Sequence, residues 1–241
     1  MNSNKKIARI AGVLYLIYIV VFTFASEIGR SRMIVFGNAA ATAKHIMASE
    51  GQFRAGFVSA LFAAVFFLLA AWALYVLLKP VNKNLALLFL LLNLGGVIVE
   101  CINTLNLLAA LLILGDADYL KAFQVDQQQA LVMLFLNLYK NGFMIAQIFY
   151  GAWLFPLGYL VFKSGVLPKI LGVVLMIHCF SWLMYFSLFF LSPDYDVTTN
   201  LSFLLGFIAE FGLTLWLLIK GIKDQKTILI EEPEIKMTAI K

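Results

Sequence analysis

Residues 53–78, FRAGFVSALFAAVFFLLAAWALYVLL, carry a single charged side chain, Arg54, next to the first residue of the stretch. The hydrocarbon core of a bilayer is about 30 Å thick, and an α-helix of about 20 apolar residues crosses it. A segment in lipid must satisfy its own backbone hydrogen bonds, and a helix does so within one run of chain. Residues 53–78 therefore predict a membrane-spanning helix.

The rest of the chain repeats this pattern. Of its 241 residues, 63% are hydrophobic and 13% are charged, whereas about a quarter of the residues in soluble domains are charged. The apolar runs predict an all-α polytopic membrane protein with one transmembrane domain, residues 1–220, followed by a disordered cytoplasmic tail, 221–241. The domain is expected to be a bundle of six transmembrane helices, at about 7–26, 53–78, 84–114, 130–162, 170–191 and 201–220.

The charged residues between the runs predict how the helices are threaded. Basic residues cluster before the first run, between the second and third, between the fourth and fifth, and after the sixth. With alternate threading these clusters all lie on one side, and excess lysine and arginine marks cytoplasmic loops. We therefore expect both termini in the cytoplasm and the protein in the plasma membrane. The opposite side is mostly acidic, although its first loop contains Arg30, Arg32 and Lys44.

The composition argues against several classes of chemistry. The net charge of +5 arises from clusters that flank the apolar runs, so nucleic acid is not an expected partner. Cys101 and Cys179 form no Cys-x-x-Cys pair, and His45 and His178 are too few for a histidine-rich metal centre. Motifs of serine hydrolases, zinc peptidases and nucleotide-binding loops are absent. We predict no catalytic residue, no metal and no cofactor, and a non-enzymatic role is favoured.

Ionisable residues inside the predicted spans suggest where a function lies. They are Glu100, Lys140, His178 and Glu210. A charge at mid-bilayer is costly unless it is paired or solvated, so such residues usually mark a site. We expect Lys140 to face the bundle interior and to pair with Glu100 or Glu210. With polar residues at helical spacing on the same faces, the candidate ligand-binding or proton-linked residues are Glu100, Lys140, Glu210, Asn103, Asn137, Gln147 and His178.

Two functions stay open for these residues. In the first, they line an intramembrane site that binds or transports a small or lipid-like molecule. In the second, the protein is a non-catalytic membrane component and its polar residues only hold helices together, as asparagine, serine and small residues do in membrane proteins. A stripe of small residues around Gly206 is also suited to an interface between copies of the chain.

Several short stretches resemble a family of bacterial membrane proteins. They are Arg30-Ser31-Arg32, Gly37 to Ala43, Phe53-Arg54, Leu74 to Val81 and Gly158 to Gly172. This family is known as domain of unknown function 4386, and the resemblance covers nearly the whole chain except its C-terminal tail. It implies the same bundle of helices and no particular activity.

The resemblance draws attention to a basic cluster at the outer mouth of the predicted bundle, formed by Arg30, Arg32 and Arg54. Guanidinium groups bind carboxylates and phosphates in a two-pronged geometry, so the cluster could receive an anionic headgroup or a carboxylate. Alternatively, the loop seals the bundle and its arginines extend to lipid phosphates. The sequence does not decide between these two roles.

Overall fold

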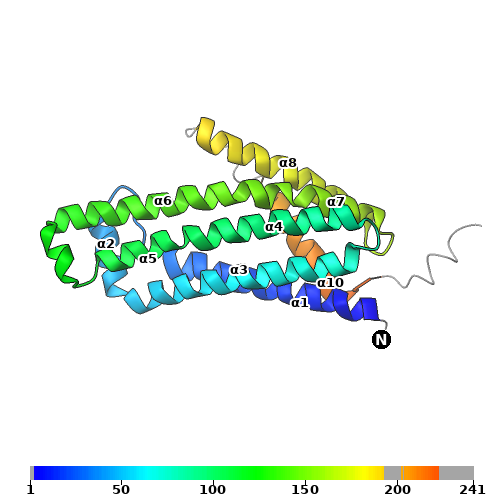
Figure 1. Cartoon of the computed structure of the whole chain (residues 1–241), viewed down its shortest axis with the longest axis horizontal. Coiled ribbons are helices and arrows are strands. Elements are labelled where there is room, and N and C mark those ends of the chain that lie inside the picture. The colour runs from blue at the N-terminus through cyan, green and yellow to red at the C-terminus, as the bar shows by residue number, and fades with distance from the viewer. Residues whose placement is uncertain (1–2, 193–201, 203, 223–241) are drawn as a thin grey trace, which may run out of the picture.

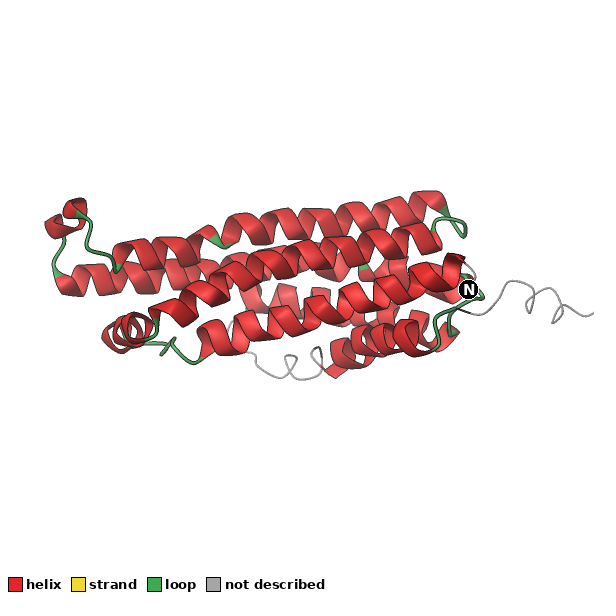
Figure 2. Ribbon diagram, turned by 90° about the horizontal axis from the view of Figure 1, so that it is seen from below, coloured by secondary structure: helices red, strands yellow, loops and turns green. Residues whose placement is uncertain are grey.

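All regular structure in the described part of the chain is helical. The computed structural model describes residues 3–192, 202 and 204–222. Five helical segments are long and apolar enough to cross a membrane: Asn4–Ser31, Glu50–Leu78, Lys83–Ile113, Val125–Lys163 and Lys169–Leu191. They lie side by side in one elongated bundle (Figures 1 and 2). The prediction of an all-helical protein with apolar spanning helices is therefore confirmed.

The sixth predicted span, 201–220, is described in part. Leu201 and Phe203 lie outside the described residues, and the apolar helix that follows, Leu204–Ile219, is shorter than the other five. Five predicted spans thus have helices of sufficient length, and the sixth has a shorter one. Of the predicted tail, 221–241, only Gly221 and Ile222 belong to the described residues.

The elements follow one another with few long connections (Figure 1). The first part of the chain forms α1 (Ser3–Thr23), the π-helix η1 (Phe24–Ser31), α2 (Ala39–Ala48), α3 (Glu50–Leu78), α4 (Lys83–Asn103) and α5 (Leu105–Ile113). The second part forms the 3₁₀ helix η2 (Asp118–Ala122), α6 (Val125–Ala152), α7 (Leu154–Lys163), α8 (Lys169–Leu191), the π-helix η3 (Phe207–Phe211) and α10 (Gly212–Ile219). Helix α1 runs directly into η1, and η3 runs directly into α10.

The two longest predicted spans each consist of two helices in line. Between α6 and α7, Pro156 has no N–H for the carbonyl of Ala152, and its ring crowds the preceding turn, so the helix is interrupted at Trp153. Between α4 and α5, the hydroxyl of Thr104 donates to the carbonyl of Glu100 at 2.8 Å. A side chain that bonds back to its own helix in this way competes with the backbone ladder and locally disturbs it.

The helices form a closed ring. Helix α1 packs against α3 and α10, α3 against α4, and α4 against α6 and α7. Helices α6 and α7 in turn contact α8, and α8 contacts η3, which continues into α10 and returns to α1. Helix α8 diverges from α6 toward its C-terminal end (Figure 1). The ring therefore brings residues from distant parts of the sequence around one interior.

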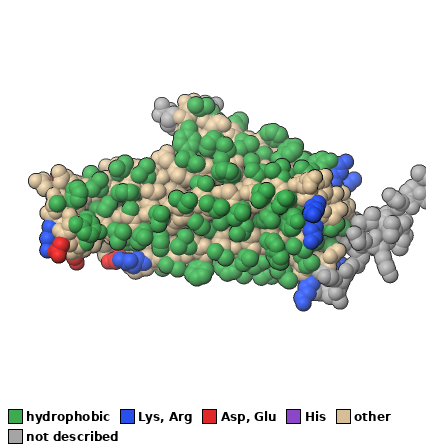
Figure 3. Space-filling view, in the orientation of Figure 1, with side chains coloured by type: hydrophobic (Ala, Val, Ile, Leu, Met, Phe, Trp, Pro, Cys, Tyr) green, Lys and Arg blue, Asp and Glu red, His purple; other side chains and the backbone are tan. Residues whose placement is uncertain are grey.

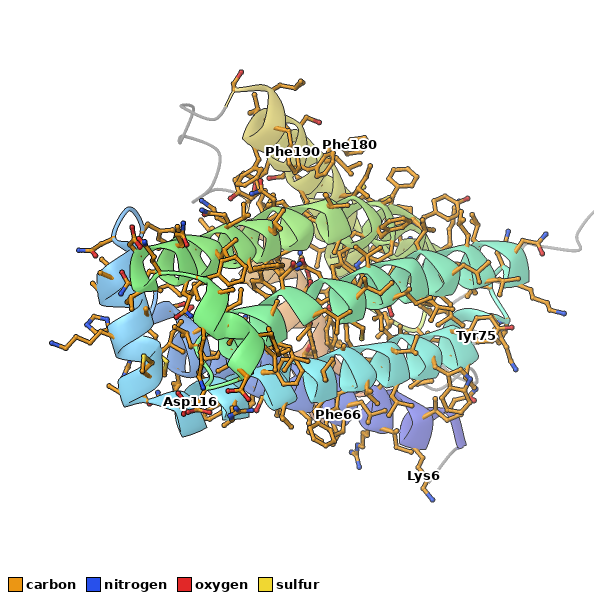
Figure 4. The ribbon with its side chains drawn as sticks, turned by 60° about the vertical axis from the view of Figure 1, so that its left-hand side comes forward. Lys6, Phe66, Tyr75, Asp116, Phe180 and Phe190 are labelled. Atoms are coloured by element: carbon orange, nitrogen blue, oxygen red, sulfur yellow. The ribbon has the colours of Figure 1, made fainter. Side chains whose placement is uncertain are left out.

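The surface has the polarity expected of a membrane protein. Large apolar side chains stand on the outside of the bundle, for example Phe62 at 58% exposure and Ile102 at 62%. Hydrophobic side chains cover the flank in Figure 3, and charged side chains gather at its two ends. Lys6 and Tyr75 lie at one of these ends and Asp116 at the other (Figure 4). Such a belt is favourable against acyl chains and unfavourable against water.

A close approach between two glycines sets the position of η1. A Cβ atom on Gly29 would lie 2.4 Å from the Cα atom of Gly56 in α3, closer than real Cβ contacts come. The two backbones can therefore meet at this point only because both residues lack side chains. The contact holds η1 against α3 and places the next residue, Arg30, in the interior, where its exposure is 7%.

Candidate functional site

The ring of helices surrounds a cavity of about 580 Å³, called here the main cavity. Five of its polar side chains come from five elements: Arg30 from η1, Glu100 from α4, Gln147 from α6, His178 from α8 and Glu210 from η3. Aromatic rings dominate the remaining wall, among them Tyr18, Phe22, Phe67, Tyr150, Trp153 and Trp182. Ligand sites in proteins commonly have this construction, with a mostly apolar wall and a few placed polar groups.

Glu210 is held by two partners in the wall of the main cavity. The hydroxyl of Tyr15, on α1, donates a hydrogen bond to Oε2 of Glu210. On the other side, Nε2 of His178 lies 3.3 Å from Oε1 of the same carboxylate. The imidazole fits there because of Gly206, where a Cβ atom would lie 2.9 Å from Nε2 of His178. Three helices are thus joined through one carboxylate.

Glu100 belongs to a second cluster. The hydroxyl of Tyr139 donates to its Oε1 at 3.3 Å. The guanidinium of Arg30 lies over the ring of Tyr139, 4.9 Å from the ring centroid, and its charge acts on Glu100. Glu100 is 7% exposed, as is Arg30. Tyr139 thus contacts both groups, and the charge of Arg30 acts on Glu100 without a direct ion pair between them.

A third contact closes the wall between α6 and α8. The indole N–H of Trp182 donates to Oε1 of Gln147 at 2.7 Å. The side-chain amide of Gln147 also donates to the carbonyl of Phe143, one turn earlier, at 3.4 Å. Gln147 is thereby fixed with its amide at the wall of the main cavity, which Trp182 also lines.

Three buried polar atoms around the main cavity have no hydrogen-bond partner among the described residues. They are Nη1 of Arg30, Oε2 of Glu100 and Nδ1 of His178. Leaving a buried donor or acceptor unsatisfied costs about 1–3 kcal/mol, and more for charged groups. All three side chains belong to residues that line the cavity. Among the described residues, no group of three His, Cys, Asp or Glu side chains is arranged to hold a metal ion.

The structure separates Lys140 from the glutamates, contrary to the predicted ion pair. Lys140 is exposed, and its Nζ lies over the rings of Phe36 and Phe189, 5.2 and 5.7 Å from their centroids. No described carboxylate lies within ion-pair distance of it. The predicted pairing is therefore wrong for the described residues, and Arg30 takes the place expected for Lys140 beside Glu100.

Lys140 lines a second cavity of about 320 Å³, called here the side cavity. The two cavities adjoin, because both are lined by Phe22, Ser26, Arg30, Phe143 and Trp182. The side cavity contains Lys140 and Arg30, and none of its described lining residues is acidic. The neighbouring spaces therefore differ in charge.

The predicted asparagines lie outside both cavity walls. Asn103 is buried and donates to the carbonyl of Tyr139 at 2.9 Å, and Asn106 donates to its Oδ1 at 3.1 Å. Asn103 also fills the space over Gly142, where a Cβ atom would lie 2.0 Å from Oδ1. Asn137 is exposed, and its backbone carbonyl accepts a bond from Asn141 at 2.8 Å. These contacts join α4 to α6 and shape the surface of α6.

The predicted basic cluster is divided by the structure. Arg30 turns into the bundle, as described above. Arg54 is exposed and pairs with Glu50 at 2.7 Å, one turn earlier on α3. Arg32 is exposed and lines neither cavity. Only Arg30 of the three therefore belongs to the candidate site.

Sequence reasoning did not select the tyrosines and the tryptophan that hold the charged groups. Tyr15, Tyr139 and Trp182 each bond a side chain that the sequence did select. Tyr15 and Tyr18 stack on Phe67, which makes one aromatic wall between α1 and α3. The signal that could have found them is the spacing of aromatic residues by three and four along α1, which places them on one face.

These features define a class: a helical membrane protein whose helices surround a cavity lined by aromatic rings and a few buried ionisable groups. Residues 10–221 match the model of the family described as Domain of unknown function (DUF4386). The chain belongs to this family, and the resemblance found in its sequence is confirmed.

A relative in Archaeoglobus fulgidus, described as "Uncharacterized protein", is 30% identical over 158 residues. The aligned part covers 66% of this chain and 78% of that protein. No solved structure matches the chain. The site is therefore interpreted from its own geometry.

Proposed function

We propose that the protein binds a small lipid-like molecule in the main cavity. The observation that carries this proposal is the set of unpartnered buried atoms on Arg30, Glu100 and His178, which belong to one mainly aromatic wall. Unpartnered charged groups are costly in a packed interior. A bound molecule with its own donors and acceptors offsets this cost, and the aromatic rings accommodate its apolar part.

The alternative, in which polar residues serve only packing, accounts for a different set of residues. Asn103 bonds the backbone of α6, and Ser181 and Ser202 share a hydrogen bond of 2.7 Å. Those polar groups find their partners within the protein. Around the main cavity, Arg30, Glu100 and His178 each keep a polar atom without a partner among the described residues, which favours binding there.

A cavity-blocking variant tests binding. Ala60 lines the main cavity from α3, so Ala60→Phe fills part of it. Val58, on the same helix, is 46% exposed on the lipid side, and Val58→Phe is the matched control. Each protein is purified in nanodiscs, and molecules that remain bound after washing are extracted and identified by mass spectrometry.

We expect a molecule enriched over empty nanodiscs in the wild type and in Val58→Phe, and its loss by about tenfold in Ala60→Phe, as for about 1.4 kcal/mol of binding free energy. Equal retention by Ala60→Phe would place binding elsewhere. Absence of any enriched molecule in a folded wild-type protein would favour the packing role.

We also propose that six helices cross the membrane with both termini in the cytoplasm. Two arguments support this arrangement: the lysine-rich turns lie at the end of the bundle that carries the N-terminus (Figure 1), and cytoplasmic loops are rich in lysine. In this proposal the short apolar helix Leu204–Ile219 serves as the sixth span. Fusion of alkaline phosphatase after residue 241 should give an inactive enzyme, and fusion after Asp116 an active one. An active C-terminal fusion would mean an odd number of spans.

A further inference from the structure

Lys140 has an unusual setting for a lysine within an apolar segment. Its ammonium lies between the rings of Phe36, in the chain after η1, and Phe189, on α8. A cation over aromatic faces is stabilised in position without being neutralised. With no described carboxylate within ion-pair distance, its charge stays available to an anion in the side cavity.

Arg30 adds a second cation to the lining of the side cavity. It lines both cavities, it is buried, and its Nη1 has no hydrogen-bond partner among the described residues. Two cations thus adjoin a space whose described lining includes no acid. A guanidinium with a free N–H beside an ammonium is a suitable receptor for a carboxylate or a phosphate.

The main cavity has the complementary character. Glu100 presents Oε2 without a partner, and Glu210 lies further along the same wall. Tyr18 and Tyr150 line the same cavity as these carboxylates. Carboxylates among aromatic rings favour an organic ammonium, because the rings attract the cation while the carboxylate pairs with it.

We propose that the ligand is a bipolar amphiphile, with an anionic oxygen group bound by Lys140 and Arg30 in the side cavity and a cationic nitrogen bound among the carboxylates of the main cavity. This inference rests on the proposed function and specifies its ligand class. The shared residues Phe22 and Phe143, which line both cavities, accommodate the apolar chain between the two charges.

Helix α8 gives the separation of the two charges. Phe189 contacts Lys140, and His178 contacts Glu210. Eleven residues separate these two positions, which corresponds to about 16 Å along an α-helix at 1.5 Å per residue. An extended chain of about a dozen carbon atoms spans this length, since consecutive single bonds near 1.5 Å advance roughly 1.2 Å each.

Three probes of equal chain length test the inference: ω-aminododecanoate, dodecanoate and dodecylamine. Binding to the protein in nanodiscs is measured by equilibrium dialysis of radiolabelled probe, with empty nanodiscs subtracted, at a pH where both end groups are ionised. We expect ω-aminododecanoate to bind about tenfold more tightly than either probe with one charge, as for one additional charge contact of about 1.4 kcal/mol.

Two variants assign the charges to the cavities. Lys140→Gln should weaken ω-aminododecanoate and dodecanoate about tenfold and leave dodecylamine unchanged. Glu210→Gln, at the far end of the separation worked out above, should weaken the two amines and leave dodecanoate unchanged, which also shows that this variant is folded. Arg32→Gln removes an exposed charge outside both cavities and is the matched control, with no change expected for any probe.

The outcomes separate this inference from the proposal on which it rests. If all three probes bind equally and Lys140→Gln changes none of them, the ligand is not bipolar, although a molecule displaced by Ala60→Phe would still support the main cavity as a site. If no probe binds above empty nanodiscs, the inference is wrong, and the cavity-blocking experiment judges the proposed function independently.

Discussion

Removal of one hydroxyl tests whether the cluster around Glu210 stabilises the bundle. In Tyr15→Phe the carboxylate loses the hydrogen bond to its Oε2 and keeps only His178. Tyr15 is 1% exposed, whereas the side chain of Glu210 is 27% exposed, so the value below is the loss expected if water does not replace the hydroxyl. Hydrogen bonds between membrane helices contribute about 0.6 kcal/mol on average, and bonds to a charged group are roughly twice as strong. We therefore expect a loss of about 1.2 kcal/mol, or roughly eightfold in the folding equilibrium.

The assay is reversible unfolding in mixed micelles titrated with a denaturing detergent and followed by tryptophan fluorescence. Tyr18→Phe is the matched control, because Tyr18 belongs to the same aromatic stack and its hydroxyl bonds no described residue. The difference between the two variants isolates the bond to Glu210 from the loss of a phenol in the cavity wall. Equal stabilities of Tyr15→Phe and Tyr18→Phe would refute the reasoning, since the carboxylate would then not depend on its tyrosine.

Two further comparisons test packing and charge, using the same unfolding assay. Gly158→Leu should cost up to about 3 kcal/mol, because a Cβ atom at Gly158 would lie 2.7 Å from a backbone carbonyl of α8. The control, Gly51→Ala, places a Cβ atom in open space and should change stability little. If Gly158→Leu is as stable as the wild type, α7 and α8 are not in close contact. Arg30→Met should destabilise the protein more than Lys140→Met, because Arg30 is buried and its charge acts on Glu100, whereas Lys140 is exposed and its replacement should cost less than about 1 kcal/mol. A larger loss of stability in Lys140→Met than in Arg30→Met would contradict the structure and favour the ion pair predicted for Lys140.

The spanning helices could be predicted because their cause is local. Any run of about 20 apolar residues must hydrogen-bond internally in lipid, so the five long helices follow from composition alone. The interior position of Glu100 and Glu210 follows from the same physics, since a carboxylate in the middle of such a run is costly against acyl chains. That both would line one cavity required the ring of helices, which no local pattern specifies.

The direction of Lys140 illustrates a limit of periodicity. A stripe of polar residues along this part of α6 suggests that Lys140 and Gln147 share an inward face. In the structure the inward face follows Leu136, Tyr139 and Gln147, and Lys140, about 100° further round the helix, is exposed. Two neighbouring faces of a helix share residues when positions are grouped at spacings of three and four, so the spacing alone does not say which face points inward. The choice between them depends on which cation the fold brings near Glu100, and this is Arg30.

Helical spacing could not predict the interior position of Arg30, for a structural reason. Residues after the first apolar run look like a loop, yet the helix continues as η1, and its π-turns bond residue i to i+5 instead of i+4. Each widened turn changes the face on which later residues lie, so spacing rules based on 3.6 residues misplace them. Glu210 also lies in a π-helix, η3. The two π-helices of the described chain thus each carry a charged residue of the main cavity. A π-turn lacks the regular hydrogen bonds of an α-helix and is therefore less stable. Such turns are expected where the direction of a functional side chain matters more than the stability of the helix.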